Sequence, residues 1–334
     1  MEIINNIEDY KEILRNEIKN DNLVIFPTET VYGIGANALS EEAVKKIFDV
    51  KTRACNNPLI VHLKSKDEIE KYAYIEQEIE KKLIDAFMPG PITIILKKKD
   101  CIPGCVTASL DTVGIRVPEN NIANRFLEIV DYPIAAPSAN ISSRPSGTKV
   151  DDIKDEFEGK VGYIIDGGES QIGLESTVIK VIDGIPTILR PGFITREMIE
   201  EVIGICNISK HVLREVENEK IESPGMMYKH YAPKTKCLLV YSKDINTLRE
   251  LVKDNLINKT IILGSKKLKD IKCYKFIDYG DTLESISHNI FSKLRECDMY
   301  HANLIIIEGV EKVGLGLAIM NRLIRTSEFN YIEK

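Results

Sequence analysis

Regular alternation between short apolar runs and helical segments constrains residues 237–334 more than any other part of this 334-residue chain. Apolar strands are expected at Cys237–Tyr241, Thr260–Gly264, Cys273–Ile277 and Asn303–Glu308. Helices are expected at Ile245–Leu256, Thr282–Met299 and Leu315–Thr326. Strands that alternate with helices favour a parallel sheet joined by right-handed crossovers. This region is therefore expected to form a small parallel α/β domain.

The earlier residues contain many short strands separated by turns with glycine and proline, which is typical of a mixed α/β domain. The expected strands are Leu23–Phe26, Leu59–Leu63, Ile92–Leu96, Thr112–Val117, Pro133–Ala136, Val161–Asp166 and Thr177–Ile182. Ser40 is suited to cap a helix whose first turn carries Glu41 and Glu42, because carboxylates favour a helix N-terminus. A second amphipathic helix is expected to end before Pro89.

A segment with two prolines and one glycine, Ser223–Pro233, separates these two regions. Its sequence favours extended backbone, because a residue that precedes proline avoids the helical conformation. We therefore predict a first domain over residues 1–206, a linker over residues 207–236 and a second domain over residues 237–334.

The formal net charge of −6 disfavours a surface built mainly to bind nucleic acid. No apolar run is long enough to cross a membrane, and the first residues lack the pattern of a secretion signal. The seven cysteines are scattered, and their odd number is unsuited to a disulfide framework. We expect a cytoplasmic protein with no stable complex with nucleic acid.

Six polar segments of the first domain follow or end apolar strands, where α/β proteins bind ligands. They are Pro27–Gly35, Lys51–His62, Gly114–Pro118, Ala136–Ser142, Leu174–Val178 and Leu189–Gly192. The cations suited to a phosphate or a carboxylate are Lys51, Arg53, Arg116 and Arg190. Because the common phosphate-loop and dinucleotide patterns are absent, these segments alone predict an anion-binding α/β protein and name no reaction.

Several of these residues also have a purely structural interpretation. The hydroxyl groups able to bond local backbone in turns are those of Thr28, Thr30 and Ser176. Lys51 and Arg53 follow a predicted helix, where cations complement the C-terminal dipole.

Three residues in the predicted strands leave two alternatives open. His62 alternates with apolar neighbours, so it lies on the opposite face of its strand, where a structural role suits it as well as a ligand site. Arg116 and Arg190 lie in apolar strands, and a buried guanidinium there needs either a bound anion or a buried carboxylate.

Taken together and in this order, the polar segments and the Ser223–Pro233 segment resemble the Sua5/YrdC/YwlC family of threonylcarbamoyl-AMP synthases. The resemblance covers nearly the whole chain. It implies a YrdC-like twisted mixed sheet with helices around a concave pocket, and a smaller Rossmann-like parallel α/β domain at the C-terminus. One departure is Ala54-Cys55, where the family pattern has proline and then a small polar residue.

The resemblance also implies a reaction: L-threonine, bicarbonate and ATP give threonylcarbamoyl-adenylate and diphosphate, the first step in forming N6-threonylcarbamoyladenosine at position 37 of tRNA. By position, the threonine pocket is expected to be lined by Thr30, His62, Arg116, Ala136 and Ser176. The residues expected to contact ATP are Arg53, Asn57, Thr112, Ser138, Ser146, Arg190 and Tyr231. Lys51 and Arg53 are expected to act in catalysis by neutralising charge at the phosphates.

The family's cation, Mg²⁺, is expected to arrive bridged by the phosphates of ATP, without a metal site of the protein's own. The linker, with Tyr231 and His230, is expected to close over the nucleotide as a lid, since a carbamate and an acyl-adenylate both hydrolyse readily. A transient contact with the tRNA threonylcarbamoyltransferase complex is also expected. The alternatives are an RNA-binding module and a carbamoyltransferase that uses carbamoyl-phosphate.

Overall fold

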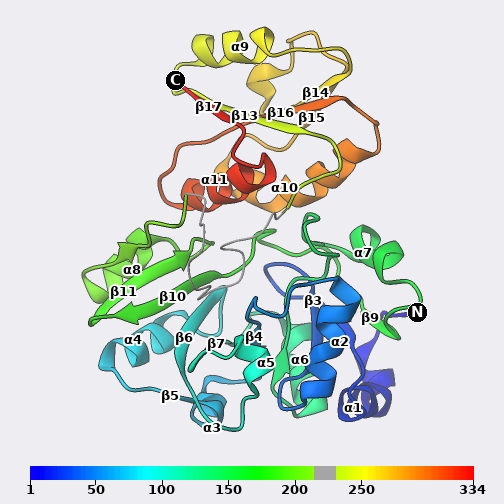
Figure 1. Cartoon of the computed structure of the whole chain (residues 1–334), viewed down its shortest axis with the longest axis vertical. Coiled ribbons are helices and arrows are strands. Elements are labelled where there is room, and N and C mark those ends of the chain that lie inside the picture. The colour runs from blue at the N-terminus through cyan, green and yellow to red at the C-terminus, as the bar shows by residue number, and fades with distance from the viewer. Residues whose placement is uncertain (214–230) are drawn as a thin grey trace.

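The computed structural model describes residues 1–213 and 231–334, which form two α/β domains stacked along the long axis of the molecule (Figure 1). Each domain has its own sheet, and no strand of the described residues belongs to both. The predicted lid falls largely outside the described residues: of the Ser223–Pro233 segment, only Tyr231, Ala232 and Pro233 are described.

The first domain is built on a 12-stranded sheet with the strand order β1-β9-β2-β3-β8-β4-β7-β6-β10-β11-β12, in which β5 pairs with β6. Its strands are β1 (Glu2–Ile4), β2 (Val24–Phe26), β3 (Gly33–Asn37), β4 (Ile60–His62), β5 (Ala73–Tyr74), β6 (Ile92–Lys98), β7 (Thr112–Arg116), β8 (Ile134–Ala135), β9 (Tyr163–Ile165), β10 (Thr177–Ile182), β11 (Ile185–Arg190) and β12 (Asn207–Ile208). Strand β7 is parallel to β4 and antiparallel to β6, which confirms the predicted mixed sheet. Strand β12 extends this sheet beyond residue 206, where the sequence placed the end of the domain.

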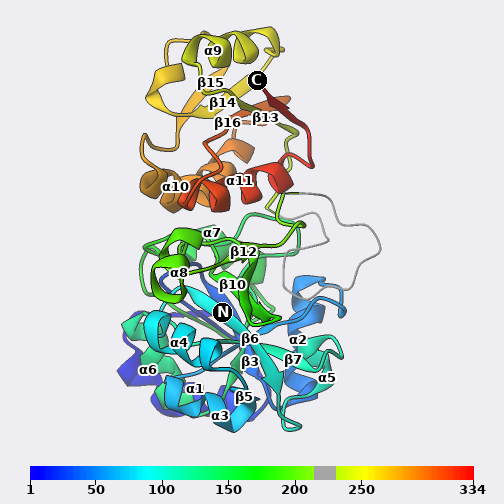
Figure 2. The same ribbon diagram turned by 90° about the vertical axis from the view of Figure 1, so that its left-hand side faces the viewer.

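Helices surround this sheet (Figures 1 and 2). They are α1 (Lys11–Lys19), α2 (Glu41–Lys51), α3 (Ile69–Tyr72), α4 (Glu78–Phe87), α5 (Gly104–Thr107), α6 (Asn121–Val130), α7 (Val150–Phe157) and α8 (Arg196–Ile203), with 3₁₀ turns at Ile7–Tyr10 and Lys66–Glu68. Helix α2 begins as predicted, because the Ser40 hydroxyl accepts a hydrogen bond from the amide of Ala43 at 3.2 Å. It ends at Lys51, because Thr52 adopts a left-handed conformation with φ 52° and ψ 46°. This ending leaves the Lys51 side chain buried.

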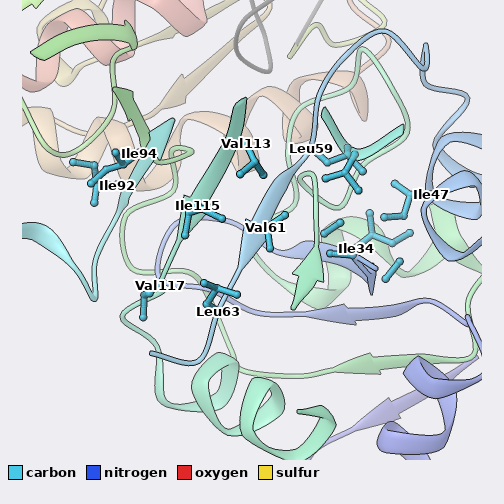
Figure 3. Packing of buried hydrophobic residues seen from close by; sticks show 14 of the residues in the cluster. Ile34, Ile47, Leu59, Val61, Leu63, Ile92, Ile94, Val113, Ile115 and Val117 are labelled. Carbon is cyan, nitrogen blue, oxygen red and sulfur yellow. The ribbon is translucent and has the colours of Figure 1, made fainter. Parts of the chain in front are cut away.

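The core of the first domain lies between the central strands and α2 (Figure 3). Val61 of β4 pairs in register with Ile115 of β7, which in turn pairs with Ile94 of β6. Successive side chains of a strand point to opposite faces of the sheet. His62 and Arg116, one position after Val61 and Ile115, therefore lie together on the face away from this core.

The second domain contains a five-stranded sheet with the order β15-β14-β16-β13-β17. All its strands are parallel, as the sequence predicted. Its elements are β13 (Cys237–Tyr241), α9 (Ile245–Asp254), β14 (Thr260–Gly264), a 3₁₀ turn at Lys266–Leu268, β15 (Lys275–Asp278), α10 (Leu283–Asp298), β16 (Leu304–Glu308), α11 (Leu315–Thr326) and β17 (Tyr331–Glu333). Helix α9 covers the outer face, and α10 and α11 lie between the sheet and the first domain (Figures 1 and 2).

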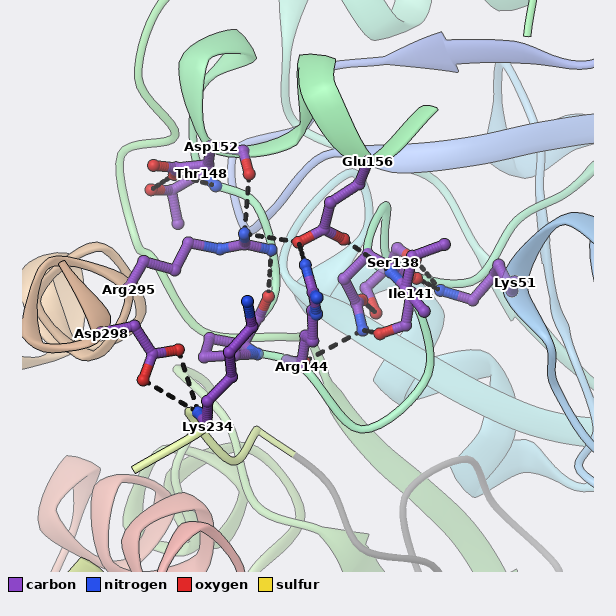
Figure 4. A network of polar contacts seen from close by, with 12 residues as sticks. Lys51, Ser138, Ile141, Arg144, Thr148, Asp152, Glu156, Lys234, Arg295 and Asp298 are labelled. Carbon is purple, nitrogen blue, oxygen red and sulfur yellow. Dashed lines mark hydrogen bonds and ion pairs between the residues drawn. The ribbon is translucent and has the colours of Figure 1, made fainter. Parts of the chain in front are cut away.

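Helix α10 joins the domains through polar contacts (Figure 4). Arg295 donates hydrogen bonds to the carbonyl oxygens of Asp152 at 2.7 Å and Pro145 at 2.5 Å, and to the Glu156 carboxylate at 2.8 Å. Gly173 approaches α10 closely: its φ is +79°, and a Cβ atom there would lie 2.5 Å from the Ser287 carbonyl oxygen. Only glycine fits this contact, so the loop before Glu175 is held directly against the second domain.

Candidate active site

A pocket opens on the first domain where loops from several strand ends meet. The predicted site residues that line it are Lys51, Arg53, His62, Arg116, Ala136, Ser138, Ser176, Arg190 and Tyr231. These residues are far apart in the sequence, and the sheet order brings them together. All four cations singled out from the sequence are among them.

Two predicted residues are buried behind the lining. Thr30 is fully buried, and its hydroxyl lies 2.8 Å from that of Thr28, which does line the pocket. Thr28 also accepts from the Val31 amide, so this hydroxyl has the local turn role that the sequence left open. Ser146 is likewise buried and donates a 2.6 Å hydrogen bond to Glu175, another lining residue.

Two more predicted residues lie to one side. Thr112 lines a smaller neighbouring cavity, which shares Pro58, Leu59 and Ile60 with the main pocket. Asn57 is buried next to these shared residues, and it lines neither cavity. The predicted ATP contacts are therefore divided between the pocket, its wall and the adjoining cavity.

His62 and Arg116 are register partners on the parallel strands β4 and β7, so they lie side by side. The His62 ring packs edge-on against Phe26, with 5.9 Å between the ring centroids. Burial, together with the charge of Arg116, lowers the pKa of His62 to about 3. His62 is therefore a neutral imidazole at physiological pH.

Arg116 has a buried carboxylate as its partner, one of the two possibilities that the sequence left open. Its Nη2 lies 2.7 Å from Oε1 of Glu29. The contact is not oriented as a hydrogen bond: neither carboxylate oxygen of Glu29, nor Nε or Nη2 of Arg116, has a hydrogen-bond partner among the described residues. A buried guanidinium with unused donors is able to bind an anion in the pocket.

Arg190 is held by backbone instead. Strand β11 pairs antiparallel with β10, and Arg190 donates from Nε and Nη2 to the Ser176 carbonyl oxygen at 3.1 and 2.9 Å. The Ser176 hydroxyl lies 2.8 Å from that of Thr93 on β6. Burial lowers the pKa of Arg190 to about 10, so the side chain stays charged at neutral pH.

Lys51 bonds to the loop after β8 (Figure 4). Its Nζ donates to the carbonyl oxygens of Ser138 and Asn140, both at 2.5 Å. Burial, and then the charge of Arg53, lower the pKa of Lys51 well below its usual value. The side chain therefore positions Ser138 in addition to lining the pocket.

Three charged residues near the pocket were not predicted from the sequence: Glu29, Glu175 and Arg322. Glu175 accepts from Ser146 and forms a 2.9 Å ion pair with Arg322 of α11, whose side chain is fully buried. Glu29 and Glu175 both lie in the polar segments after strands, and the need of the buried arginines for carboxylates was a signal that pointed to them. Arg322 gave no such signal, because only the docking of α11 brings it to the first domain.

Tyr231 lines the pocket from the start of the second described range. Its ring stacks on Phe291 of α10, with centroids 5.1 Å apart, and the Arg322 guanidinium lies 5.6 Å from its centroid. The second domain therefore fixes one of the residues expected to contact ATP.

Across the two described ranges, no group of three or more His, Cys, Asp or Glu side chains is arranged to hold a metal ion. In the same ranges, no helix combines the length and the apolar character that crossing a membrane requires. All seven cysteines are described, and each is a free thiol.

Residues 16–192 match the family model Sua5_yciO_yrdC, described as "Telomere recombination", and residues 194–327 match the model described as "Threonylcarbamoyl-AMP synthase, C-terminal domain". A threonylcarbamoyl-AMP synthase of Pyrococcus abyssi is 42% identical over 98% of this chain and 97% of its own length, and one of Bacillus subtilis is 38% identical over 93% and 90%. The crystal structure of P. abyssi Sua5 complexed with L-threonine superposes with a TM-score of 0.94 at 41% identity, covering 100% of both chains. The chain therefore belongs to the Sua5/YrdC family of threonylcarbamoyl-AMP synthases.

Proposed function

We propose that this protein is an L-threonylcarbamoyladenylate synthase, which converts L-threonine, bicarbonate and ATP to threonylcarbamoyl-AMP and diphosphate. Full-length similarity to synthases of this name supports the activity. The structural observation that carries the proposal is the pocket, which gathers Lys51, Arg53, Arg116 and Arg190 in a chain of net charge −6. A site with several cations suits the anionic substrates ATP and bicarbonate. The full-length similarity to synthases favours this activity over an RNA-binding module or a carbamoyl-phosphate-dependent transferase.

Threonine is proposed to bind on the β4–β7 side of the pocket. Arg116 has donors available for the substrate carboxylate, and Glu29 beside it offers oxygens for the ammonium side of a zwitterion. The neutral His62 and the hydroxyl of Ser176 line the same pocket, with Ala136 in the wall and Thr30 behind Thr28. Because these groups are neutral, they favour an amino acid with a small polar side chain over one with a charged side chain.

ATP is proposed to occupy the side bounded by the remaining predicted residues. Arg53 and Arg190 provide positive charge, the Ser138 hydroxyl is held by Asn140, and Tyr231 offers an aromatic face. Of the other expected contacts, Thr112 lines the adjoining cavity, and Asn57 and Ser146 are buried beside the pocket. The nucleotide would therefore extend from the pocket toward the adjoining cavity.

The proposed chemistry is an attack by a carbamate oxygen of N-carboxylated threonine on the α-phosphorus of ATP, with diphosphate as the leaving group. Transfers of this kind need alignment and neutralisation of spreading negative charge more than covalent help from the protein. Arg53, with Lys51 beside it, is placed for that neutralisation. Lys51 additionally orients the Ser138 loop through its two hydrogen bonds.

Magnesium is proposed to enter bound to the phosphates of ATP, whose charge it would offset. Among the described residues that line the pocket, Glu175 has the one carboxylate that could bind a metal ion, but it already accepts hydrogen bonds from Ser146 and Arg322. The donor set therefore suits a cation whose ligands come mainly from ATP and water.

The product is an acyl-phosphate anhydride, so the proposal includes exclusion of water and a rapid next step. We propose that a tRNA threonylcarbamoyltransferase complex consumes the adenylate; the segment expected to cover the site, Ser223–Pro233, lies largely outside the described residues. Free thiols at all seven cysteines support a reducing compartment such as the cytoplasm.

The test is an amino-acid panel. The protein is mixed with ATP, Mg²⁺, bicarbonate and one amino acid at a time, and diphosphate release is measured. We expect release that depends on threonine and on bicarbonate. Release without threonine, or equal release with serine, valine and threonine, would refute the proposed activity.

A further inference from the structure

We propose that Arg322 of α11 is a positioning residue of the active site, which acts through Glu175 to hold the ATP side of the pocket in one arrangement. The proposal rests on the synthase activity proposed above, and it assigns the second domain a direct part in the site. Nothing in the primary sequence places this helix near the pocket.

The guanidinium of Arg322 donates hydrogen bonds to the first domain. Its Nε lies 2.9 Å from Oε2 of Glu175, and its Nη1 donates to the Pro191 carbonyl oxygen at 2.9 Å. Both acceptors belong to first-domain segments that form the pocket, and the Arg322 side chain is fully buried. Asn321 fixes the guanidinium further, because its Oδ1 accepts from Nη1 at 2.8 Å. A guanidinium with this many directed bonds holds its acceptors in a fixed geometry.

Glu175 in turn contacts a residue expected to bind ATP. Its other oxygen, Oε1, accepts a 2.6 Å hydrogen bond from the Ser146 hydroxyl. The next residue, Ser176, presents its carbonyl oxygen to Arg190. One buried chain of contacts therefore runs from Arg322 through Glu175 to residues expected to bind ATP. A buried polar network whose members are all satisfied specifies a single arrangement.

Tyr231 lines the same pocket. The Arg322 guanidinium lies 5.6 Å from the centroid of its ring, within cation–π range. One turn along α11, the Thr326 hydroxyl donates to the Tyr231 carbonyl oxygen at 3.3 Å. The same helix therefore positions Glu175 and Tyr231 relative to each other.

Arg322 also affects the pKa of Glu175. Burial by itself would raise the pKa of Glu175, but Arg322 and then Arg190 offset this and hold it below the usual value. The other titratable groups that face this carboxylate are Lys51 and Tyr231. Without Arg322 the pKa of Glu175 should rise, and a protonated Glu175 no longer presents two acceptor oxygens to its neighbours.

The experiment compares Arg322→Met, Arg322→Lys, Glu175→Gln and the double variant E175Q/R322M with wild type. The matched control is Arg249→Met, which removes an arginine that pairs with exposed Asp270 on the outside of the second domain. Initial rates of threonine-dependent diphosphate release are measured against ATP and threonine from pH 5.5 to 8.5, and folding is checked by thermal unfolding.

For Arg322→Met we expect KM for ATP to rise about tenfold or more, KM for threonine to change by less than about threefold, and the acid limb of kcat/KM for ATP to move to higher pH. Arg322→Lys keeps the charge and should retain the wild-type pH profile. In the double variant the acid limb should not show the shift seen in Arg322→Met, because glutamine at position 175 does not titrate. The two substitutions should raise KM for ATP by less than the product of their single effects, because both act on one pair.

A wild-type ATP KM and pH profile in Arg322→Met would overturn the inference. So would equal losses on both substrates with an unshifted acid limb, which would mark a merely structural role. If Arg322→Met does not fold, Arg322→Lys and the double variant decide: a shifted limb in either contradicts the proposal. Wild type that releases no diphosphate with threonine would instead refute the proposed function itself.

Discussion

Glu29 Oε1 lies 2.7 Å from Nη2 of Arg116, which lines the pocket, and both side chains are buried. The pairing explains how an apolar strand tolerates an arginine, since a buried guanidinium without a carboxylate would be costly. The poor hydrogen-bond geometry of the same contact leaves donors on Arg116 for a substrate.

Arg116→Ala should raise KM for threonine by roughly 10- to 100-fold, the range expected for losing a charge-assisted bond of about 1.5–3 kcal/mol. Glu29→Gln should act in the same direction by about tenfold, because Arg116 loses the charge that holds it. Both are measured by diphosphate release with threonine varied at saturating ATP.

Arg125→Ala serves as the control, since this arginine pairs with exposed Glu8 on the surface of the same domain. Arg53→Ala should have the opposite effect: it should raise KM for ATP and leave KM for threonine unchanged. Indistinguishable effects of Arg116→Ala and Arg53→Ala would contradict the division of the pocket.

Lys51→Met tests the contacts of Lys51 with the Ser138 loop. The folded-state pKa of Lys51 is depressed by burial, so protonation opposes folding, and the folded protein should gain stability as pH rises toward the unfolded value near 10.5. Lys51→Met should lack this gain, and its unfolding free energy should fall further behind wild type at pH 10 than at pH 8. A difference that is the same at both pH values, in denaturant unfolding, would argue against the depressed pKa.

His62 gives a prediction in the acid range. Its folded pKa of about 3 lies below the ordinary value of 6.5, so its contribution to stability is present above pH 6.5 and is lost as pH falls toward 3. His62→Gln, which does not titrate, should lose roughly 4 kcal/mol less than wild type over that interval. His301→Asn, at an exposed turn, should follow wild type; a parallel decline of His62→Gln and wild type would contradict the low pKa.

Arg295→Ala tests the contact between the domains. The variant loses hydrogen bonds to Glu156 and to two carbonyl oxygens of the first domain, and we expect a loss of about 2–4 kcal/mol. Calorimetry should show the two domains unfolding in more separate steps than in wild type. Arg249→Ala, which breaks a surface pair, should cost less than about 1 kcal/mol. Equal losses in the two variants would show that Arg295 is no more important than a surface residue.

Sequence patterns predicted the second domain better than the first. The structure reproduces Cys237–Tyr241, Thr260–Gly264 and Leu315–Thr326 without a shift, because buried parallel strands and amphipathic helices have strong periodic signals. Strand β3, with the sequence GIGAN, gave no such signal because glycine is a poor strand former. Tertiary packing requires glycine at position 35, because a Cβ atom there would lie 2.7 Å from the Ile134 side chain.

The sequence likewise predicted some residues of the site and missed others. Polar segments at strand ends marked most of the residues that line the pocket, because the carboxyl ends of strands are where α/β folds expose loops. The ion pair between Glu175 and Arg322 could not be predicted, since its members are 147 residues apart and meet only when α11 docks on the first domain. Local patterns carry no information about such docking.

The identity of the product tests the proposed reaction most directly. Wild-type protein is incubated with ATP, Mg²⁺, threonine and isotopically labelled bicarbonate, and the nucleotide products are analysed by mass spectrometry. We predict a threonine-dependent adenylate that retains the labelled carbon and that disappears with Arg116→Ala at limiting threonine. An adenylate without the label, or no adenylate beside released diphosphate, would contradict it.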